Sequence, residues 1–294
     1  MIFTLTACSG GGNDKTGEAG REAAAEDRTG TAGTEDKSDK PDDSAGAEAV
    51  EPTGQSEGGS TADTGDAGES EGETEKGLPD YRDSKISGID DDFYICSISD
   101  KLFDRMYGLS FKEDCTVPRE ELRYLHVLHK DLDGETHEGE MVVNRAIADD
   151  VLDILKKLYD ADYPIERMVL VDDYGADDET SMRANNSSSF NFRFISHTTV
   201  VSKHGRGLAV DINTLYNPYI KTLDDGTDIL EPATAGDYVD RTKDFPYKID
   251  ENDLCYKLFT EKGFEWGGNW VTCKDYQHFE MPDSFIEALD AGND

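Results

Sequence analysis

Two short stretches of the chain carry the residue types of a catalytic metal site. In the first, His204 and Asp211 stand seven positions apart with two glycines between them. Because glycine lets the backbone turn tightly, a loop His and a strand Asp can converge there on one point. In the second, Asp275 precedes His278 by three residues. That spacing is short enough for both side chains to face one site.

Two imidazoles and one carboxylate form a ligand set that suits catalytic zinc, which takes three protein ligands and leaves a fourth position for water. We therefore expect His204, Asp211 and His278 to hold zinc (Zn2+). Bound zinc lowers the pKa of its water to about 7 and polarises a carbonyl group. A carboxylate that does not bind the metal must then accept a proton. Asp275 fits this role of general base.

Other side chains near these stretches have more than one explanation. Glu280 follows His278 by two residues, so the two side chains share a face of a pleated strand. Glu280 is then either a carboxylate that orients His278 or a salt-bridge partner. His126 and His129 fall in a predicted strand and His137 in its turn, so we expect surface or core roles for them.

Two tryptophans, Trp266 and Trp270, precede the second stretch. Large aromatic side chains usually pack in a core or at a rim, which is the simpler expectation here. The alternative is that these two residues shape a substrate groove.

Three segments are predicted to be helices that position these residues. Ser99 can cap a short helix that Gly108 ends. Apolar residues recur at helical spacing over residues 145–159, which predicts a helix with one apolar face. A last helix is expected over residues 253–262.

Strands are predicted between and after these helices. Residues 124–132 and 139–144 flank a turn-rich segment and should form a hairpin. Further short strands are expected at residues 169–171, 190–195, 208–212 and 277–281. Helices mixed with antiparallel strands in this order predict an α+β fold, a small antiparallel sheet flanked by helices.

Composition divides the chain into a tether and a domain. From Ser9 to Gly77, Val50 is the only large aliphatic or aromatic residue. Such a segment has too little apolar surface to offset the entropy of ordering its backbone. We therefore expect a disordered acidic tether over residues 9–85 and one folded domain over residues 86–294.

The charge of the chain excludes one class of partner. The formal net charge is -36, whereas binding of nucleic-acid phosphates needs a basic surface. We expect no nucleic-acid partner. A repulsive acidic surface also favours a soluble domain, and we expect a monomer.

Residues 1–8 resemble the end of a bacterial lipoprotein signal peptide, in which the box Leu5-Thr6-Ala7-Cys8 is cleaved before a cysteine that becomes lipidated. The resemblance implies a protein anchored by Cys8 to the outer face of the bacterial membrane, with no other membrane contact. The segment lacks a basic start and has a short apolar run, which indicates that the true start lies upstream. The alternative is a disordered leader with a chance cysteine. Four further cysteines are compatible with disulfides in an exported protein.

The two metal-site stretches also carry a family resemblance. They are similar to the D-alanyl-D-alanine carboxypeptidase (VanY-like) family of zinc peptidases, which includes L-alanyl-D-glutamate endopeptidases. The matching pattern is Ser202-x-His204-x-x-Gly207-x-Ala209-x-Asp211, then Asn217-Pro218-Tyr219, and later Asp275-x-x-His278-Phe279-Glu280. The segment 194–200 departs from the glycine-rich link usual in the family.

This resemblance implies more than the residues alone. It implies the fold shared with hedgehog-type domains, and it makes Ser188 and Arg193 candidate substrate binders. A guanidinium suits a bidentate grip on a peptide carboxylate. The expected activity is hydrolysis of peptidoglycan stem peptides at the terminal D-alanyl-D-alanine bond. Cleavage between L-Ala and D-Glu is one alternative, and an inactive zinc-containing wall-binding domain is another; the presence of Asp275 argues for turnover.

Overall fold

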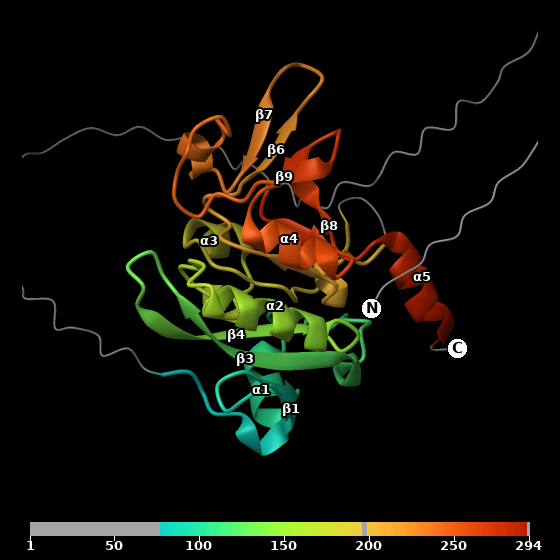
Figure 1. The fold of residues 1–294 in the computed structure, drawn as a ribbon. Coiled ribbons are helices and arrows are strands. Elements are labelled where there is room, and N and C mark those ends of the chain that lie inside the picture. Colours follow the sequence, from blue (N-terminus) through green and yellow to red (C-terminus); the bar gives the residue numbers. More distant parts are fainter. Residues whose placement is uncertain (1–76, 196–198, 293–294) are drawn as a thin grey trace, which may run out of the picture. The chain divides into compact units, whose positions relative to one another are not determined.

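The computed structural model describes residues 77–195 and 199–292 (Figure 1). Cys8 and most of the expected tether lie outside the described residues. Tyr81 is already buried, and strand β1 (Lys85–Gly88) follows the short 3-10 helix η1 (Arg82–Ser84). The folded part therefore begins several residues before position 86, where composition placed its start.

The first sheet has four antiparallel strands in the order β1-β2-β3-β4. Strands β2 (Tyr94–Ser97), β3 (Leu122–Lys130) and β4 (Thr136–Asn144) follow β1. Strand β3 is buried on both faces, because its side chains alternate between two clusters. Leu125 and Val127 pack in the cluster that contains residues of helix α2 (Ala148–Asp160). Leu122 and Tyr124 pack in the cluster that contains residues of helix α1 (Asp100–Met106).

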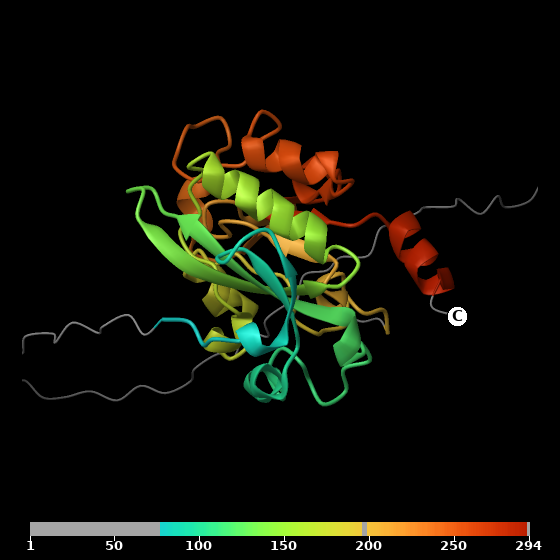
Figure 2. The ribbon, with the colours of Figure 1, turned by 60° about the horizontal axis from the view of Figure 1, so that its bottom comes forward.

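Helix α2 (Ala148–Asp160) covers one face of this sheet (Figure 2). Its buried residues Val151, Ile154, Leu155 and Leu158 recur every three or four positions, so one stripe of the helix faces the core. Helix α1 (Asp100–Met106) begins at Ser99, whose hydroxyl accepts a hydrogen bond from the Leu102 amide. Helix α4 (Leu254–Glu261) packs beside α2 and is capped by the Asp253 carboxylate.

Two further three-stranded sheets carry the residues singled out for chemistry. One has the order β5-β10-β8, from Ala209–Asp211, His278–Glu280 and Glu265–Trp266. The other has the order β7-β6-β9, from Asp228–Glu231, Tyr219–Thr222 and Lys274–Asp275. In Figure 1 the β6–β7 hairpin projects away from the first sheet. Helices α3 (Asp178–Arg183) and α5 (Asp283–Gly292) complete the larger elements.

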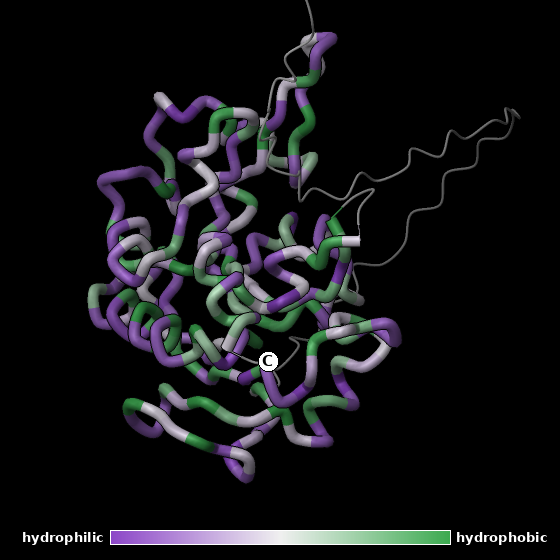
Figure 3. Tube along the Cα trace, turned by 90° about the vertical axis from the view of Figure 1, so that its right-hand side faces the viewer, coloured by the Kyte–Doolittle hydropathy of each residue, from purple (hydrophilic) through white to green (hydrophobic). Residues whose placement is uncertain are grey.

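The described residues confirm an α+β fold with antiparallel sheets, which is compatible with the peptidase resemblance. Its likeness to hedgehog-type domains stays a prediction. Hydrophilic residues dominate the peripheral loops, whereas apolar residues run through the central elements (Figure 3). None of the described helices combines the length and the apolar character needed to cross a membrane.

Most predicted elements are confirmed, but two strands are wrong. Residues 169–171 do not pair as a strand, because the Asn186 side chain bonds both the amide and the carbonyl of Val169 at 2.9 Å. Residues 190–195 bond to separate segments, since the Phe190 amide donates to the Val142 carbonyl oxygen and the Phe192 amide to that of Ser110. In the first segment a side chain forms the backbone hydrogen bonds, and in the second the backbone bonds to several separate segments. Neither segment therefore forms the regular hydrogen bonds of a sheet.

Three of the four cysteines that are compatible with disulfides form none in the described residues. Cys96, Cys115 and Cys255 carry free thiols in the part of the chain that the structure describes. Burial raises the pKa of the Cys115 thiol to about 11, which keeps this thiol protonated and unreactive at neutral pH.

Candidate metal centre

His204 stands on a tight turn that only glycines allow. It begins the 3-10 helix η4 (His204–Arg206), and Gly207 follows with φ of 67°. A Cβ on Gly207 would lie 2.7 Å from the Asn144 nitrogen, and one on Gly205 would lie 2.8 Å from the Arg193 carbonyl oxygen. The turn is therefore pressed against neighbouring backbone, which fixes where His204 points.

Strand pairing brings the second stretch to the first. In the antiparallel pair of β10 and β5, His278 lies directly opposite Asp211. Side chains of directly opposed residues lie about 5 Å apart on the same face of the sheet. The pairing register, and not chain proximity, thus places His278 beside Asp211.

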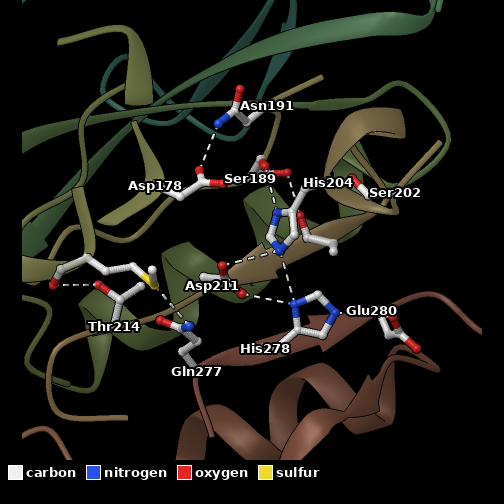
Figure 4. A network of polar contacts seen from close by, with 12 residues as sticks. Asp178, Ser189, Asn191, Ser202, His204, Asp211, Thr214, Gln277, His278 and Glu280 are labelled. Atoms are coloured by element: carbon white, nitrogen blue, oxygen red, sulfur yellow. Dashed lines mark hydrogen bonds and ion pairs between the residues drawn. The ribbon is translucent and has the colours of Figure 1, made fainter. Parts of the chain in front are cut away.

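His204, Asp211 and His278 converge on one point (Figure 4). The His204 Nε2 lies 3.0 Å from His278 Nδ1 and 3.2 Å from Asp211 Oδ2. The His278 Nδ1 also lies 3.0 Å from Asp211 Oδ1. One ligand atom from each residue lies within 4.8 Å of the others, and both imidazoles are buried. The structure therefore brings together the three residues that the sequence predicted as metal ligands.

The outer nitrogen of each imidazole has its own acceptor. His204 Nδ1 lies 2.8 Å from the Ser189 carbonyl oxygen, and His278 Nε2 lies 3.1 Å from Glu280 Oε2. When each outer nitrogen donates its proton to that acceptor, the inner nitrogens present lone pairs to each other. Two lone pairs and a carboxylate at this spacing repel one another unless a cation lies among them. The donor set thus fits a zinc ion.

Electrostatics at this point favour positive charge. Burial opposes it, but hydrogen bonds to Asp211 and Glu280 raise the pKa of His278 well above its usual range. Burial likewise opposes ionisation of Asp211, yet the neighbouring His204 and His278 hold its pKa well below the usual value. Against the same burial, the hydrogen bond to His278 lowers the pKa of Glu280 to about 2. These carboxylates therefore stay ionised around the centre.

Asp275 lies beside this centre without a protein hydrogen bond to its Oδ1 atom in the described residues. It ends β9 and pairs with Tyr219 of β6. Gly267 permits its position, because a Cβ there would lie 2.6 Å from the Asp275 carbonyl oxygen. Burial raises the pKa of Asp275 to about 7; Asp211 adds to the rise and His278 opposes it. A carboxyl group with this pKa can both accept and release a proton near neutral pH.

The centre and Asp275 line one pocket of about 600 Å³. Arg193 also lines the pocket, and its Nη1 atom lies 3.6 Å from Asp178 Oδ2. The β6–β7 hairpin forms another wall of the pocket with Ile229, Leu230 and Glu231. The pocket therefore places a guanidinium and a reactive centre within one cavity of the size that small ligands and peptides occupy.

The remaining predicted residues take definite places. Ser188 lines the pocket and exchanges backbone hydrogen bonds with Asp211 at 3.0 and 2.8 Å. Glu280 combines both of its expected roles, since it contacts His278 and also accepts a hydrogen bond from Lys203 at 3.0 Å. Trp266 is buried in the core, whereas Trp270 lines the pocket.

Three further histidines in the described residues lie outside the centre. His126 and His129 are buried, and burial lowers the pKa of His129 to about 4. His137 is paired with Asp131 at 2.9 Å. Core and surface roles are thus confirmed for these three residues.

Sequence reasoning missed several residues that line the pocket. Asn191 donates through Nδ2 to Asp178 Oδ1 at 2.7 Å and to the Ala176 carbonyl oxygen at 3.2 Å. Gln277 lies next to His278 and contacts the Met182 sulfur at 3.3 Å. An amide side chain has no spacing signature of its own, so only position next to a predicted ligand pointed to Gln277.

A fold of this kind with a buried His-Asp-His cluster and a neighbouring carboxylate defines a metallopeptidase-like site. Comparison with known proteins agrees: residues 196–281 match the family model of D-alanyl-D-alanine carboxypeptidases. This segment contains both metal-site stretches, so the family resemblance is confirmed there. The match supports a zinc peptidase that acts on cell-wall peptides. No curated protein and no solved structure matches the chain.

Proposed function

We propose that this chain is a zinc-dependent peptidase that removes the terminal D-alanine from peptidoglycan stem peptides. The observation that carries the proposal is the meeting of His204, Asp211 and His278 in a pocket that also holds Asp275. Zinc held by the three residues would polarise the scissile carbonyl group and acidify a water molecule.

The side chains around the centre have separate tasks. Asp275 accepts the proton of the attacking water and passes it to the amine nitrogen as the C–N bond breaks. Glu280 and the Ser189 carbonyl oxygen hold the outer imidazole protons, so that both inner nitrogens stay available as ligands.

Arg193 supports the choice of a carboxypeptidase over an endopeptidase. Its guanidinium lies in the same pocket as the centre and can bind the free carboxylate of a terminal D-alanine. Ser188 is held against Asp211 by two backbone hydrogen bonds, and we assign it to the same substrate end of the pocket.

The direct test incubates the zinc-loaded full chain with a synthetic stem pentapeptide and identifies the products by mass. The proposal predicts loss of one D-alanine from the wild-type reaction and almost none with Asp275→Asn. Release of L-alanine instead would assign the endopeptidase activity. Zinc binding without any cleavage would favour the inactive wall-binding domain.

We also propose that the protein is exported and anchored through a lipid on Cys8, with the acidic segment as its tether. This part of the proposal rests on the sequence of residues 1–8. When the full chain is expressed in bacteria behind a complete lipoprotein signal peptide, radiolabelled palmitate should label it in the membrane fraction, and Cys8→Ala should abolish the label. Equal labelling of both chains would contradict the anchor.

A further inference from the structure

Several residues that line the pocket carry a buried polar atom without a protein partner. Four such side-chain atoms in the described residues are Asn191 Oδ1, Trp270 Nε1, Asp275 Oδ1 and Gln277 Oε1. All four residues line the pocket. Folded proteins leave few buried polar atoms unsatisfied, and each one calls for an explanation. Their concentration in one cavity indicates a ligand that supplies the missing partners.

The two tryptophans differ in whether the indole N–H has a hydrogen-bond acceptor in the protein. The Trp266 indole nitrogen donates to the Tyr276 carbonyl oxygen at 2.9 Å, as a buried indole normally does. The Trp270 indole nitrogen is also a buried atom, although the residue is only partly buried, and it has no acceptor among the described residues. Because an indole N–H only donates, its missing partner must be an acceptor atom.

The Trp270 indole is held close to the metal centre. Its ring centroid lies 5.3 Å from that of His278. It follows the 3-10 helix η6 (Gly267–Asn269), and its own amide donates to the Gly267 carbonyl oxygen at 3.1 Å. Lys274 fastens the same turn through the Gly268 carbonyl oxygen at 3.0 Å. The unpartnered indole N–H therefore belongs to a turn that two hydrogen bonds stabilise close to the metal centre.

The other unpartnered atoms describe the chemistry of the ligand. Asn191 Oδ1 is an acceptor, because its Nδ2 already donates to the Ala176 carbonyl oxygen and to Asp178. Gln277 Oε1 is likewise an acceptor in a buried side chain. A ligand that satisfies these atoms and Trp270 must offer both hydrogen-bond donors and an acceptor atom. A peptide backbone offers both groups at every residue.

We propose that Trp270 is a substrate-binding residue whose indole N–H donates a hydrogen bond to a carbonyl oxygen of the peptide next to the scissile bond. This inference rests on the proposed peptidase function. It names a specificity contact in addition to Arg193 and Ser188, and it explains why an indole N–H stays buried without a protein acceptor.

Nuclear magnetic resonance can observe this contact directly, because the chain has two tryptophans and hence two indole N–H signals. The full chain is labelled with ¹⁵N, loaded with zinc and carries Asp275→Asn, so that the stem pentapeptide binds without turnover. Trp270→Phe in the same background assigns the two signals. We expect the Trp270 indole proton to move downfield as peptide is added, while the Trp266 signal stays in place.

Activity of matched variants provides the second readout. Trp270→Phe keeps an aromatic ring but removes the donor, and it should lower kcat/KM about tenfold, the value of one hydrogen bond. Trp270→Phe should not lower Tm, because the indole N–H that it removes forms no hydrogen bond within the protein. Trp266→Phe should lower Tm, since its N–H is bonded, and should change kcat/KM far less.

Each result bears on the inference. Peptide-induced shifts of other pocket signals with a stationary Trp270 indole signal, together with unchanged kcat/KM in Trp270→Phe, would overturn the Trp270 contact and leave the peptidase function standing. No shifts and no hydrolysis by the wild-type chain would overturn both.

Discussion

Two buried carboxylates, Glu140 on strand β4 and Asp275 on strand β9, have opposite surroundings. Glu140 is fully buried and accepts hydrogen bonds from Arg105 Nη1 at 2.9 Å and from the Tyr124 hydroxyl at 3.1 Å. Asp275 has a buried Oδ1 atom with no protein donor in the described part of the chain. Glu140 is thus paired with one cation and one hydroxyl group, whereas the Asp275 Oδ1 atom has no such partner among the described residues.

Glu140 therefore belongs to the structural scaffold, and Asp275 belongs to the candidate site. Leaving a buried charge unpaired costs stability, so a protein retains one only where it has a use. The Glu140 cluster ties helix α1 to strand β4 and, through Arg105, to Asp173. The pocket-lining residues around Asp275 instead carry buried polar atoms without a protein partner, which is the pattern of a preorganised binding and reaction site.

The largest expected effect comes from replacing Asp275, the carboxylate in the pocket. Asp275→Asn should lower kcat by about 10²- to 10⁴-fold, because an amide cannot accept the proton of the attacking water. Zinc content should stay at the wild-type value. The same change should leave the free energy of unfolding equal or higher, since burial disfavours the charged form of Asp275. Retention of full activity would refute the assignment of Asp275 as the base.

The wild-type enzyme should also show the pH dependence of this base. Because burial raises the pKa of Asp275 to about 7, the fraction able to accept a proton grows as the pH rises toward that value. We therefore expect kcat/KM to increase with pH between about 5 and about 7.

The reciprocal change replaces the carboxylate on the scaffold side. Glu140→Gln removes the charge that faces Arg105, and breaking a buried ion pair costs about 3 kcal/mol. Urea denaturation measures this loss, while zinc content and kcat of the folded variant should match the wild type. A variant that is as stable as the wild type but inactive would reverse the roles assigned to the two regions.

A smaller effect is expected at the substrate end of the pocket. Arg193→Ala should raise KM about tenfold or more and change kcat less, because a contact to the peptide carboxylate is equally strong in ground and transition states. Arg193→Lys keeps the charge without the bidentate fork and should recover part of the loss. Steady-state kinetics with the pentapeptide measure both. A fall in kcat at constant KM would assign Arg193 to the reaction itself.

The smallest effect concerns a buried histidine of the scaffold. Burial lowers the pKa of His129 to about 4, below the value of about 6.5 in an unfolded chain. The unfolded chain therefore binds a proton more readily between these values, and stability falls as the pH drops through this window. His129→Gln should flatten the dependence by at most about 1.4 kcal/mol per pH unit. Urea denaturation of the zinc-free chain from pH 7 to pH 4 measures the difference; equal slopes would contradict it.

The sequence predicted those parts in which local pattern and function coincide. Helix α2 and the β3–β4 hairpin follow from the periodicity of their apolar residues, and both elements are confirmed. The residues of the metal centre could be chosen because His, Asp and glycine at those spacings suit one chemistry. No local pattern predicts the strand register that sets His278 opposite Asp211.

Other features depend on contacts that no local pattern records. Strands β6 and β7 are short, and only part of their surface is buried, so they carry little alternation. The apolar run around Val169 predicts a strand, but the Asn186 side-chain amide forms the hydrogen bonds of the Val169 backbone instead. The distinction between Trp266 and Trp270 exists only in the folded chain, because it depends on whether an acceptor lies in front of the indole nitrogen.

The central claim is that two distant stretches of the chain hold one metal ion, and X-ray absorption at the zinc edge tests it most directly. The zinc-loaded full chain should contain one zinc per molecule, with two imidazole nitrogens and oxygen ligands around it. His204→Ala should lose the zinc, whereas His137→Ala should keep it. A chain that binds no zinc, or that binds it equally well after His204→Ala, would contradict the account.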